Sequence, residues 1–343
     1  MLAVRLLAVG RPLELYDVDP REPGPGEVRV RVRAAGICHS DAHYRAGLSP
    51  MGSLPLTLGH EIAGLVNRAG EGVTDVIEGD RVALHYLVSC GACDSCAAGR
   101  ETFCPDAAML GHHVDGGFAE FVTVPARNAV KLPDPISFEH GAVMMCSSAT
   151  ALHALRRGRL APGERVAIFG CGGLGVSAVQ LARALGASEV FAVDVAADKL
   201  ALASKLGAFP IDAGRGDPVH ALRAAAGGAG VDVALEFVGL PGTMRQALRS
   251  LAPRGRAVLV GLSDSKLDLD PYREILGPEA ELIGSNDHTL GELHELIGLA
   301  CSGRLDLSHA VARLVPLEAD AINATLDALL EHRAPARTVV VPA

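Results

Sequence analysis

The sequence predicts an α/β protein of two domains, in which a β-rich domain precedes a doubly wound parallel sheet. Its 343 residues are enough for two domains of ordinary size. Over about the first 150 residues, short segments of alternating hydrophobicity are separated by Gly- and Pro-rich turns. Beyond them, apolar segments alternate with Ala- and Leu-rich helical patterns, which is typical of βαβ units. We expect domains over residues 1–149 and 150–288, with about 289–343 completing the first.

The strands of the first domain are predicted from period-2 patterns. Residues 28–34 alternate Val with Arg, which places the valines on one face of a half-buried strand. The N-terminal MLAVRLLAVG also has the character of a strand, and three more candidates lie between turns: Glu61–Asn67, Arg81–Leu84 and Phe118–Val124.

The second domain is predicted from strands that alternate with helices. The strand candidates are apolar runs at Arg165–Phe169, Glu189–Val193, Val231–Glu236 and Arg256–Val260. Helical patterns cover Val176–Leu185, Asp198–Leu206, Val219–Ala225 and Thr243–Leu251. Near the end of the chain, two helical patterns precede a strand that we expect to return to the first domain: Leu290–Cys301, Ala319–Glu331 and the strand Arg337–Val341.

Charge and composition argue against several classes of function. The chain has 31 Lys and Arg against 40 Asp and Glu, a net charge of −9, which is the wrong sign for binding along nucleic-acid phosphates. No apolar run approaches the roughly 18 residues of a membrane span, and Arg5 interrupts the N-terminal stretch, unlike a secretory signal. We therefore expect a cytoplasmic protein without membrane or nucleic-acid partners. Its eight cysteines would then stay reduced and serve metal binding or catalysis.

A glycine-rich loop indicates a dinucleotide. The hexapeptide GCGGLG has the pattern G-x-G-x-x-G, follows the apolar strand RVAIF and opens a helix, which is the context that a dinucleotide-binding loop requires. Its glycines allow a tight turn and a close approach of the backbone to a pyrophosphate, while the helix N-terminus adds N–H groups and a positive dipole end. The candidate cofactor-binding residues are Gly170, Gly172, Gly173, Leu174 and Gly175.

Asp194 predicts NAD rather than NADP. It ends the next strand, 19 residues after Gly175, where a carboxylate accepts hydrogen bonds from the adenosine ribose and repels a 2′-phosphate. Residues 195–197 (VAA) offer that phosphate no Arg. Lys199 is placed to reach the same ribose. The alternatives are a solvated helix lysine and, for the loop as a whole, an ordinary glycine turn with a helix-capping Asp.

Four cysteines lie close together in the stretch SCGACDSCAAGRETFC: Cys90, Cys93, Cys96 and Cys104. Four thiolates at this spacing can surround one tetrahedral Zn²⁺ and fill its coordination sphere, which leaves no position for substrate and makes the metal structural. An iron–sulfur cluster is the competing functional interpretation. Disulfides are disfavoured by the expected compartment and by the tight spacing.

A second set of candidate metal ligands is spread along the chain. Cys38 lies in GICHSDAH, His60 and Glu61 lie in GHE, and Cys146 follows an apolar segment. Two thiolates and an imidazole with one exchangeable position make a recognised type of catalytic zinc site. Taken alone, Cys146 is more typical of inert packing in a core.

These motifs occur in one order in one chain, and together they resemble the zinc-dependent medium-chain alcohol dehydrogenases. The resemblance covers the whole length and implies a GroES-like catalytic domain and a Rossmann domain, with the active site in the cleft between them. It implies two zinc ions per chain, with Cys38, His60 and Cys146 as ligands of the catalytic one and Glu61 as a nearby fourth ligand that swings in and out. It also implies that Asp41 orients a zinc ligand; an ordinary turn cap is the alternative.

The resemblance implies reversible oxidation of an alcohol to an aldehyde or ketone, with hydride transfer to NAD. Ionising an aliphatic alcohol of pKa roughly 16 at pH 7 costs about 12 kcal/mol, and coordination to Zn²⁺ supplies a large part of it. Ser40 is implied to hydrogen-bond the substrate oxygen, and His43 to relay the proton to bulk water through the cofactor ribose. A mere surface histidine is the alternative for His43.

Other cofactor contacts follow from the same resemblance. Three residues match cofactor positions of the family, and each is alternatively a surface or packing residue: His39 at the pyrophosphate, Thr150 at the nicotinamide and Arg337 at a phosphate. Near the ends of two later strands, the backbone is expected to border the nicotinamide at Val238, Gly261 and Leu262.

The motifs define the substrate only as a class. Cys146 resembles the simple alcohol dehydrogenases more than the polyol dehydrogenases, which often have an acidic residue there, so we expect a primary or secondary alcohol. Leu48, Tyr86 and His112 are candidates for the pocket wall. A polyol, threonine or other secondary-alcohol dehydrogenase is the alternative within the superfamily, and a non-catalytic NAD-binding sensor is the alternative outside it. The retained ligands and relay residues disfavour a zinc-free quinone reductase relative.

The resemblance also implies a homodimer or homotetramer. Subunits of the family usually pair through the edge strand of the Rossmann sheet, for which Arg273–Gly284 is the candidate stretch.

Overall fold

The computed structural model describes residues 1–49, 51–331, 333 and 337–343. The chain forms two compact units. Unit 1 comprises Met1–Cys146, Thr289–Cys301 and Asp306–Ala343, and unit 2 comprises Ser147–His288 and Ser302–Leu305.

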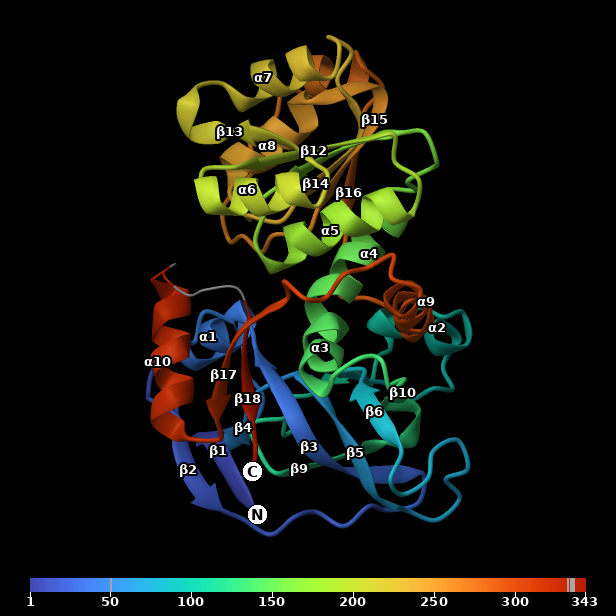
Figure 1. Cartoon of the computed structure of the whole chain (residues 1–343). Coiled ribbons are helices and arrows are strands. Elements are labelled where there is room, and N and C mark those ends of the chain that lie inside the picture. Colours follow the sequence, from blue (N-terminus) through green and yellow to red (C-terminus); the bar gives the residue numbers. More distant parts are fainter. Residues whose placement is uncertain (50, 332, 334–336) are drawn as a thin grey trace. The chain divides into compact units, whose positions relative to one another are not determined.

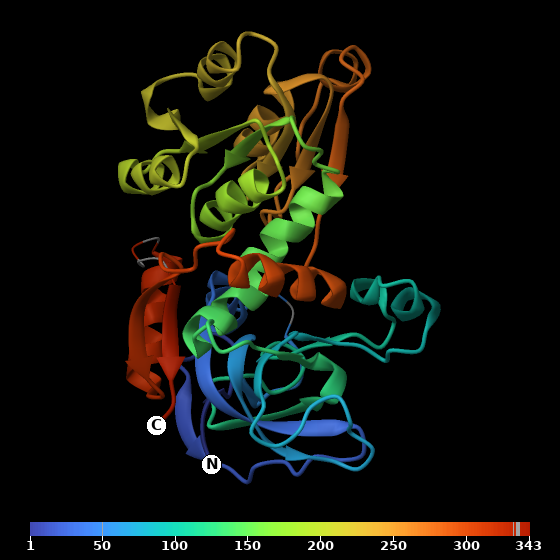
Figure 2. The same ribbon diagram turned by 45° about the vertical axis from the view of Figure 1, so that its right-hand side comes forward.

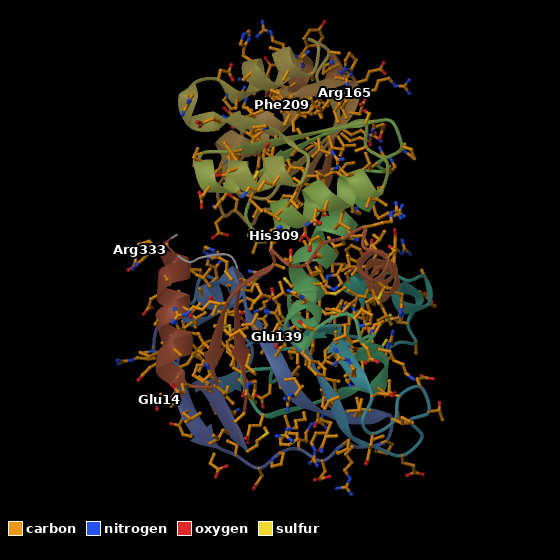
Figure 3. All side chains as sticks on the ribbon, viewed as in Figure 1. Glu14, Glu139, Arg165, Phe209, His309 and Arg333 are labelled. Carbon is orange, nitrogen blue, oxygen red and sulfur yellow. The ribbon has the colours of Figure 1, made fainter. Side chains whose placement is uncertain are left out.

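Unit 1 is built on a mostly antiparallel sheet of seven strands in the order β10-β6-β5-β3-β18-β17, with β9 also paired to β3. Its strands are β3 (Glu27–Ile37), β5 (Glu61–Ala69), β6 (Arg81–Leu84), β9 (Phe121–Pro125), β10 (Ala129–Lys131), β17 (Val311–Pro316) and β18 (Arg337–Val341). A three-stranded sheet holds β1 (Leu2–Leu6), β2 (Glu14–Asp17) and β4 (Leu56–Thr57), and β7 (Leu87–Val88) pairs with β8 (Ala108–Met109). Figure 3 labels Glu14 on the edge strand β2.

Period-2 alternation places β3 as predicted. Val28, Val30 and Val32 are buried, and the arginines between them are half-buried or exposed. The predicted return of the chain end is confirmed, because β18 pairs antiparallel with β3, with Thr338 opposite Ile37. Residues more than 300 positions apart therefore lie side by side at the end of β3.

Five α-helices lie in the described residues of unit 1: α1 (His39–Ala46), α2 (Asp94–Ala97), α3 (Phe138–Val143), α9 (Leu290–Cys301) and α10 (Ala319–Leu330). Figures 1 and 2 show α10 beside α1. Arg45 near the end of α1 makes a salt bridge with Asp327 of α10 and contacts Asn323. This fastening holds α1 in place against the C-terminal helix.

Unit 2 contains a six-stranded parallel sheet in the order β13-β12-β11-β14-β15-β16. Its strands are β11 (Arg165–Phe169), β12 (Glu189–Asp194), β13 (Phe209–Asp212), β14 (Val231–Glu236), β15 (Leu251–Leu259) and β16 (Glu281–Gly284). Its helices are α4 (Ala149–Arg157), α5 (Gly173–Ala184), α6 (Ala197–Lys205), α7 (Pro218–Ala225) and α8 (Pro241–Arg249). Figure 1 shows α5 and α6 on one face of the sheet and α8 on the other, which is the doubly wound arrangement that the sequence predicts.

Two edges bound this sheet. The exposed Phe209, labelled in Figure 3, lies on the edge strand β13. The opposite edge strand is β16, within the stretch Arg273–Gly284. Between them the strand order reverses where β11 adjoins β14, and ligands of open α/β sheets bind at such a reversal.

Several predicted boundaries are wrong. The strand predicted from Phe118 begins only at Phe121, because the Phe118 backbone is hydrogen-bonded to Leu58 and Val4 instead. Helix α5 begins at Gly173, three residues earlier than predicted, because glycines hide a helix start from a pattern of apolar residues.

The end of α8 was also mispredicted. This helix ends at Arg249, since Leu251 already pairs with Val231 as the first residue of β15. Proline stands at its first position, Pro241, which starts it earlier than the apolar pattern indicates.

No helix in the described ranges combines the length and the apolar character that crossing a membrane requires.

Candidate functional site

Four residues that are distant in the sequence converge in unit 1. The ligand atoms of Cys38, His60, Glu61 and Cys146 all lie within 4.8 Å of one another, and all four side chains are buried. The register of the sheet brings three of them together. Cys38 directly follows β3, His60 and Glu61 stand at the start of β5, and Gly36 of β3 pairs with Glu61 of β5.

Cys146 reaches the cluster from a different element. It lies in a π-helical turn, Met144–Ser148, that joins α3 to α4, and α3 packs against β3 and β5. A π-turn inserts one residue into a helix and is frequent at functional sites. The sequence pattern indicated only an apolar segment here, so this helix was missed.

Asp41 connects the parts of the cluster. Its Oδ2 accepts a hydrogen bond from the Cys38 amide at 2.8 Å, and its Oδ1 accepts one from the Gly59 amide at 3.2 Å. The same Oδ1 lies 3.3 Å from Nδ1 of His60. Because an ionised carboxylate only accepts hydrogen bonds, Nδ1 carries the proton and Nε2 is left as the ligand atom. Asp41 is therefore both a helix cap and the residue that orients His60.

The carboxylate of Asp41 has the largest electrostatic effect on His60. Desolvation lowers the pKa of His60, but Asp41 outweighs it and raises that pKa well above the usual value. An imidazole held by a carboxylate in this way is a more basic ligand than a free one.

Glu61 is fully buried and has no hydrogen-bond donor of good geometry among the described residues, although Nη2 of Arg337 lies 2.7 Å from its Oε1. Burial raises the pKa of Glu61 to about 8. A Cβ at Gly36 would lie 2.0 Å from Oε2 of Glu61, so glycine is needed there to leave room for the carboxylate. A buried carboxylate with unsatisfied oxygens beside two thiols is suited to a cation.

The two thiols shift the pKa of one another in opposite directions. A hydrogen bond from the Cys146 thiol lowers the pKa of Cys38 well below its usual value, and the same bond together with burial raises the pKa of Cys146. Arg337 adds a positive charge next to Cys38. Two sulfurs, one imidazole nitrogen and one carboxylate form a donor set that fits zinc.

Helix α1 carries the residues expected to move the proton. Ser40 and His43 are three positions apart, so both lie on one face of the helix. Ser40 Oγ lies 3.8 Å from Cys38 Sγ, and His43 is half-buried with its ring 4.7 Å from that of His39. Of the predicted pocket residues, Tyr86 lies edge-on to His60 at 5.3 Å, His112 stacks on Tyr44 at 4.2 Å and Leu48 is exposed.

The four-cysteine lobe, residues 90–104, brings its ligand atoms within 4.8 Å of one another. Cys90 Sγ and Cys96 Sγ are 3.9 Å apart, close to the roughly 3.8 Å between thiolates that each lie about 2.3 Å from one tetrahedral zinc. Backbone N–H groups of Ala92 and Cys93 point at Cys90 Sγ and lower the pKa of this thiol to about 6. All eight cysteines are unpaired in the structure, and the 3.9 Å between Cys90 Sγ and Cys96 Sγ is much longer than the roughly 2.05 Å of a disulfide bond.

This spacing fits one ion better than a cluster. Iron–sulfur clusters bind their thiolates on different iron atoms and hold them further apart than a single ion does. The lobe therefore favours zinc over the competing interpretation.

The lobe is anchored to the rest of unit 1. Glu101, which is 3% exposed, accepts a hydrogen bond from the Leu290 amide at the start of α9. His85 lies 3.8 Å from the same carboxylate. A Cβ at Gly91 would collide with the guanidinium of Arg127, which lies over the first turn of the lobe.

The glycine-rich loop of unit 2 has the geometry that its sequence predicts. Gly170 has φ +91°, and a Cβ at Gly175 would lie 2.0 Å from the Gly170 carbonyl, so the loop needs glycine at both positions. Asp194 Oδ2 accepts a hydrogen bond from the Cys171 amide at 2.7 Å, which fixes the carboxylate at the edge of the loop. The amides of Val195 and Ala196 bond its other oxygen.

The remaining cofactor candidates of unit 2 lie on three elements. Val238, Gly261 and Leu262 are at the carboxyl ends of β14 and β15, where Val238 and Leu262 are exposed. Thr150 is buried in α4 and Lys199 is exposed on α6. In unit 1, Arg337 of β18 contacts Glu61 rather than solvent.

The motifs indicate no role for Gly36 or Glu236 and no pairing of Glu61 with Arg337. Gly36 stands inside the motif GICHSDAH, so its position was visible but its contact with Glu61 was not. Glu236 ends a predicted strand without any motif, and Arg337 is far from Glu61 in the sequence. The contact between Arg337 and Glu61 becomes visible only once the pairing of the strands is known.

Comparisons with known proteins cover both units. The family "Alcohol dehydrogenase GroES-like domain" matches residues 24–134, and "Zinc-binding dehydrogenase" matches residues 173–300. The chain is 36% identical over 333 residues to an alcohol dehydrogenase of Geobacillus stearothermophilus, with 96% of both chains covered. It is 33% identical to an NAD-dependent alcohol dehydrogenase of Sulfurisphaera tokodaii over the full length of both. Among solved structures, an alcohol dehydrogenase from Thermus sp. ATN1 superposes with a TM-score of 0.93 at 32% identity, covering 100% of both chains.

Proposed function

The chain belongs to the zinc-dependent medium-chain alcohol dehydrogenases, which act with NAD, and we propose that Cys38, His60 and Cys146 bind the catalytic zinc of this enzyme. The single observation that carries the proposal is the buried convergence of these ligand atoms with those of Glu61 within 4.8 Å. The substrate is a primary or secondary alcohol, oxidised reversibly to an aldehyde or ketone. Cys90, Cys93, Cys96 and Cys104 bind the second, structural zinc.

Each group of the cluster has a task. Zinc supplies Lewis acidity toward the substrate oxygen, and NAD accepts the hydride. Cys38 and Cys146 compensate the charge of the metal, and Asp41 keeps His60 in the tautomer that presents Nε2. Glu61 would offer a fourth, exchangeable ligand to the bound metal, because its neighbour Arg337 gives the carboxylate an alternative partner.

Helix α1 removes the proton. Ser40 Oγ accepts the hydroxyl proton of the alcohol while its own proton passes on, and His43 receives it on the same helix face. Because His43 is only half-buried, it can release the proton to solvent. His39, next to Ser40, approaches the pyrophosphate of the cofactor, and Arg337 contributes positive charge to the same phosphates.

The cofactor lies on unit 2. Gly170, Gly172, Gly173, Leu174 and Gly175 receive the pyrophosphate, and Asp194 accepts the hydroxyls of the adenosine ribose with Lys199 beside it. The backbone at Val238, Gly261 and Leu262 borders the nicotinamide, and Thr150 contacts it. D194A should reduce the preference for NAD over NADP at least about tenfold, since a hydrogen bond to a charged acceptor contributes about 1.5–3 kcal/mol. An unchanged ratio of kcat/KM for the two cofactors would contradict this role.

The cellular setting follows from charge and thiol chemistry. Eight unpaired cysteines fit a reducing compartment, so the protein works in the cytoplasm. A net charge of −9 disfavours nucleic acid as a partner. The chain forms a homodimer or homotetramer through the edge strand β16, and its other partners are small molecules.

Metal analysis tests the proposal. We expect two zinc ions per chain in the purified protein and one in C38A, with oxidation of alcohols by NAD lost in the variant. C301A is the matched control, because Cys301 is exposed on α9 and belongs to neither ligand group. One zinc in the unaltered protein, unchanged by C38A, would refute the catalytic site.

A further inference from the structure

The carboxylate of Glu236 lies at the end of β14, fully buried, and none of the roles assigned above uses it. Its Oε1 accepts hydrogen bonds from the amides of Val238 and Gly239, each at 2.9 Å, and from the Thr243 hydroxyl at 2.7 Å. Its Oε2 accepts a second, longer bond from the Gly239 amide at 3.2 Å. All of its hydrogen bonds therefore go to residues 238–243, the loop that follows the strand and the first turn of α8.

No basic side chain among the described residues acts on this carboxylate: burial raises the pKa of Glu236 above the usual value, and only hydrogen bonds from Thr243, Gly239 and Val238 oppose that shift. Burying a carboxyl group without a counter-ion costs free energy that only its hydrogen bonds offset. The N-cap residue of α8, Leu240, has no capping side chain, and Glu236 contacts the first turn of this helix through the Thr243 hydroxyl.

The loop that Glu236 holds meets two other loops. Gly239 has φ +85°, and a Cβ there would lie 2.2 Å from the Leu262 carbonyl; a Cβ at Gly261 would lie 2.1 Å from the Gly239 amide nitrogen. On the other side, a Cβ at Gly170 would lie 2.8 Å from Cγ2 of Val238. The loops after β14 and β15 are therefore packed backbone against backbone, and the Val238 side chain packs against Gly170 in the loop after β11.

The main chain of Glu236 takes part in the same junction. Its carbonyl accepts hydrogen bonds from the amides of Val260 and Gly261 at 2.9 and 3.0 Å. The junction lies where β11 adjoins β14, the reversal of strand order at which open α/β sheets bind their ligands. A small shift of the backbone at residues 238–240 would therefore also displace the glycine-rich loop and residues 261–262.

We propose that Glu236 is a positioning residue for NAD: it holds residues 238–240 in the conformation that brings the loops after β11, β14 and β15 together, and so sets the affinity of unit 2 for the dinucleotide. The inference rests on the proposed function, because it takes NAD as the ligand of these loops. It assigns Glu236 no contact with the reacting atoms.

Equilibrium binding of NADH to the full-length protein, followed by nicotinamide fluorescence, tests the proposal together with the melting temperature of each variant. E236A should raise the Kd for NADH about tenfold or more. E236Q should stay within about threefold, because the amide oxygen of glutamine still accepts the three bonds made by Oε1. In steady state, E236A should raise KM for NAD more than it lowers kcat.

The matched control is E274A. Glu274 is another buried carboxylate of unit 2, paired with Arg245 and Arg249. It accepts a hydrogen bond from the Asp270 amide, at the far end of the segment after β15, and it bonds none of residues 170–175, 238–240 and 260–262. Its replacement should lower the melting temperature without changing the Kd for NADH by more than about twofold. A loss of affinity in E274A equal to that in E236A would show that general destabilisation explains both, and would overturn the proposal.

Two further results would also overturn it. The first is a folded E236A that binds NADH within twofold of the unaltered protein. The second concerns T243V, which serves as the test if E236A does not fold, because it removes one of the donors to Oε1 at a half-buried position. At least a twofold rise in the Kd for NADH supports the proposal, and no change contradicts it. Failure of the dehydrogenase assignment is distinguishable, since it would leave NADH binding intact while no alcohol is oxidised.

Discussion

Both metal-ligand groups of unit 1 contain thiolates, but the chain builds them in different ways. The lobe takes four cysteines between Cys90 and Cys104, of which Cys90 is exposed, and surrounds them with backbone N–H groups. The catalytic group takes residues from Cys38 to Cys146, all buried, and surrounds them with the charged side chains of Asp41 and Arg337. A local ligand set can close around a metal as the segment folds. A dispersed set exists only after the sheet has formed, and its charged neighbours can then tune reactivity.

The comparison is tested most strongly by exchanging one cysteine in each group for serine. C146S should lower kcat at least about 10³-fold, since Lewis-acid stabilisation of several kcal/mol is lost at about 1.4 kcal/mol per tenfold. C104S should instead lower the melting temperature by roughly 10 °C or more, because a structural zinc contributes several kcal/mol to folding and each kcal/mol shifts a unit of this size by about 2–4 °C. Steady-state kinetics, calorimetry and zinc content per chain measure both. If the two variants lose activity equally, each normalised to folded protein, the distinction between a catalytic and a structural metal site would be wrong.

A smaller effect is expected from the residue that orients His60. D41N removes the negative charge facing Nδ1 and should lower kcat or zinc affinity about 10–100-fold, the usual cost of losing a partner of a metal-bound histidine. The variant D217N is the control, because Asp217 caps α7 in unit 2 without a metal ligand nearby. Steady-state kinetics and competition with a chelator for zinc measure these effects. If D41N is as active as D217N and keeps its zinc equally well, Asp41 is only a helix cap.

His85, between the lobe and Tyr86, provides a pH-dependent test. Burial lowers the pKa of His85 to about 4 from its ordinary value of about 6.5. Between these values the unfolded chain binds a proton that the folded chain does not, so folding stability falls as pH is lowered from about 6.5 to 4. The melting temperature of the unaltered protein should therefore fall by several degrees more across this window than that of H85Q. Parallel curves for the two proteins would contradict the burial of a neutral His85.

The smallest effect concerns the anchor of the lobe. E101A removes the acceptor for the Leu290 amide and should cost about 0.5–2 kcal/mol, as for other helix caps, with kcat unchanged. The melting temperature should fall by a few degrees, whereas E14Q, on the exposed edge strand β2, should leave it unchanged. If E101A lowers kcat without changing the melting temperature, the lobe affects the catalytic group directly and does not only stabilise unit 1.

Local chemistry made much of this protein predictable from sequence. The alternation in β3 and the spacing of the four cysteines each require only neighbouring residues, and the structure forms both locally. The glycine loop and Asp194 belong to one βαβ unit, in which the strand that ends at Asp194 pairs with the strand before the loop. The dispersed ligands Cys38, His60 and Cys146 were found through a resemblance, because no local pattern specifies which distant residues meet.

Only the tertiary structure decided the contacts between distant segments. The register of β3 with β5 and β18 puts Glu61 against Gly36 and Arg337, and a π-turn brings Cys146 to Cys38. The close packing of three loops around Glu236 likewise depends on which strands are neighbours in the parallel sheet. Sequence patterns carry the periodicity and chemistry of a single segment, whereas pairing between segments depends on burying their faces together, and this pairing determines where each side chain lies.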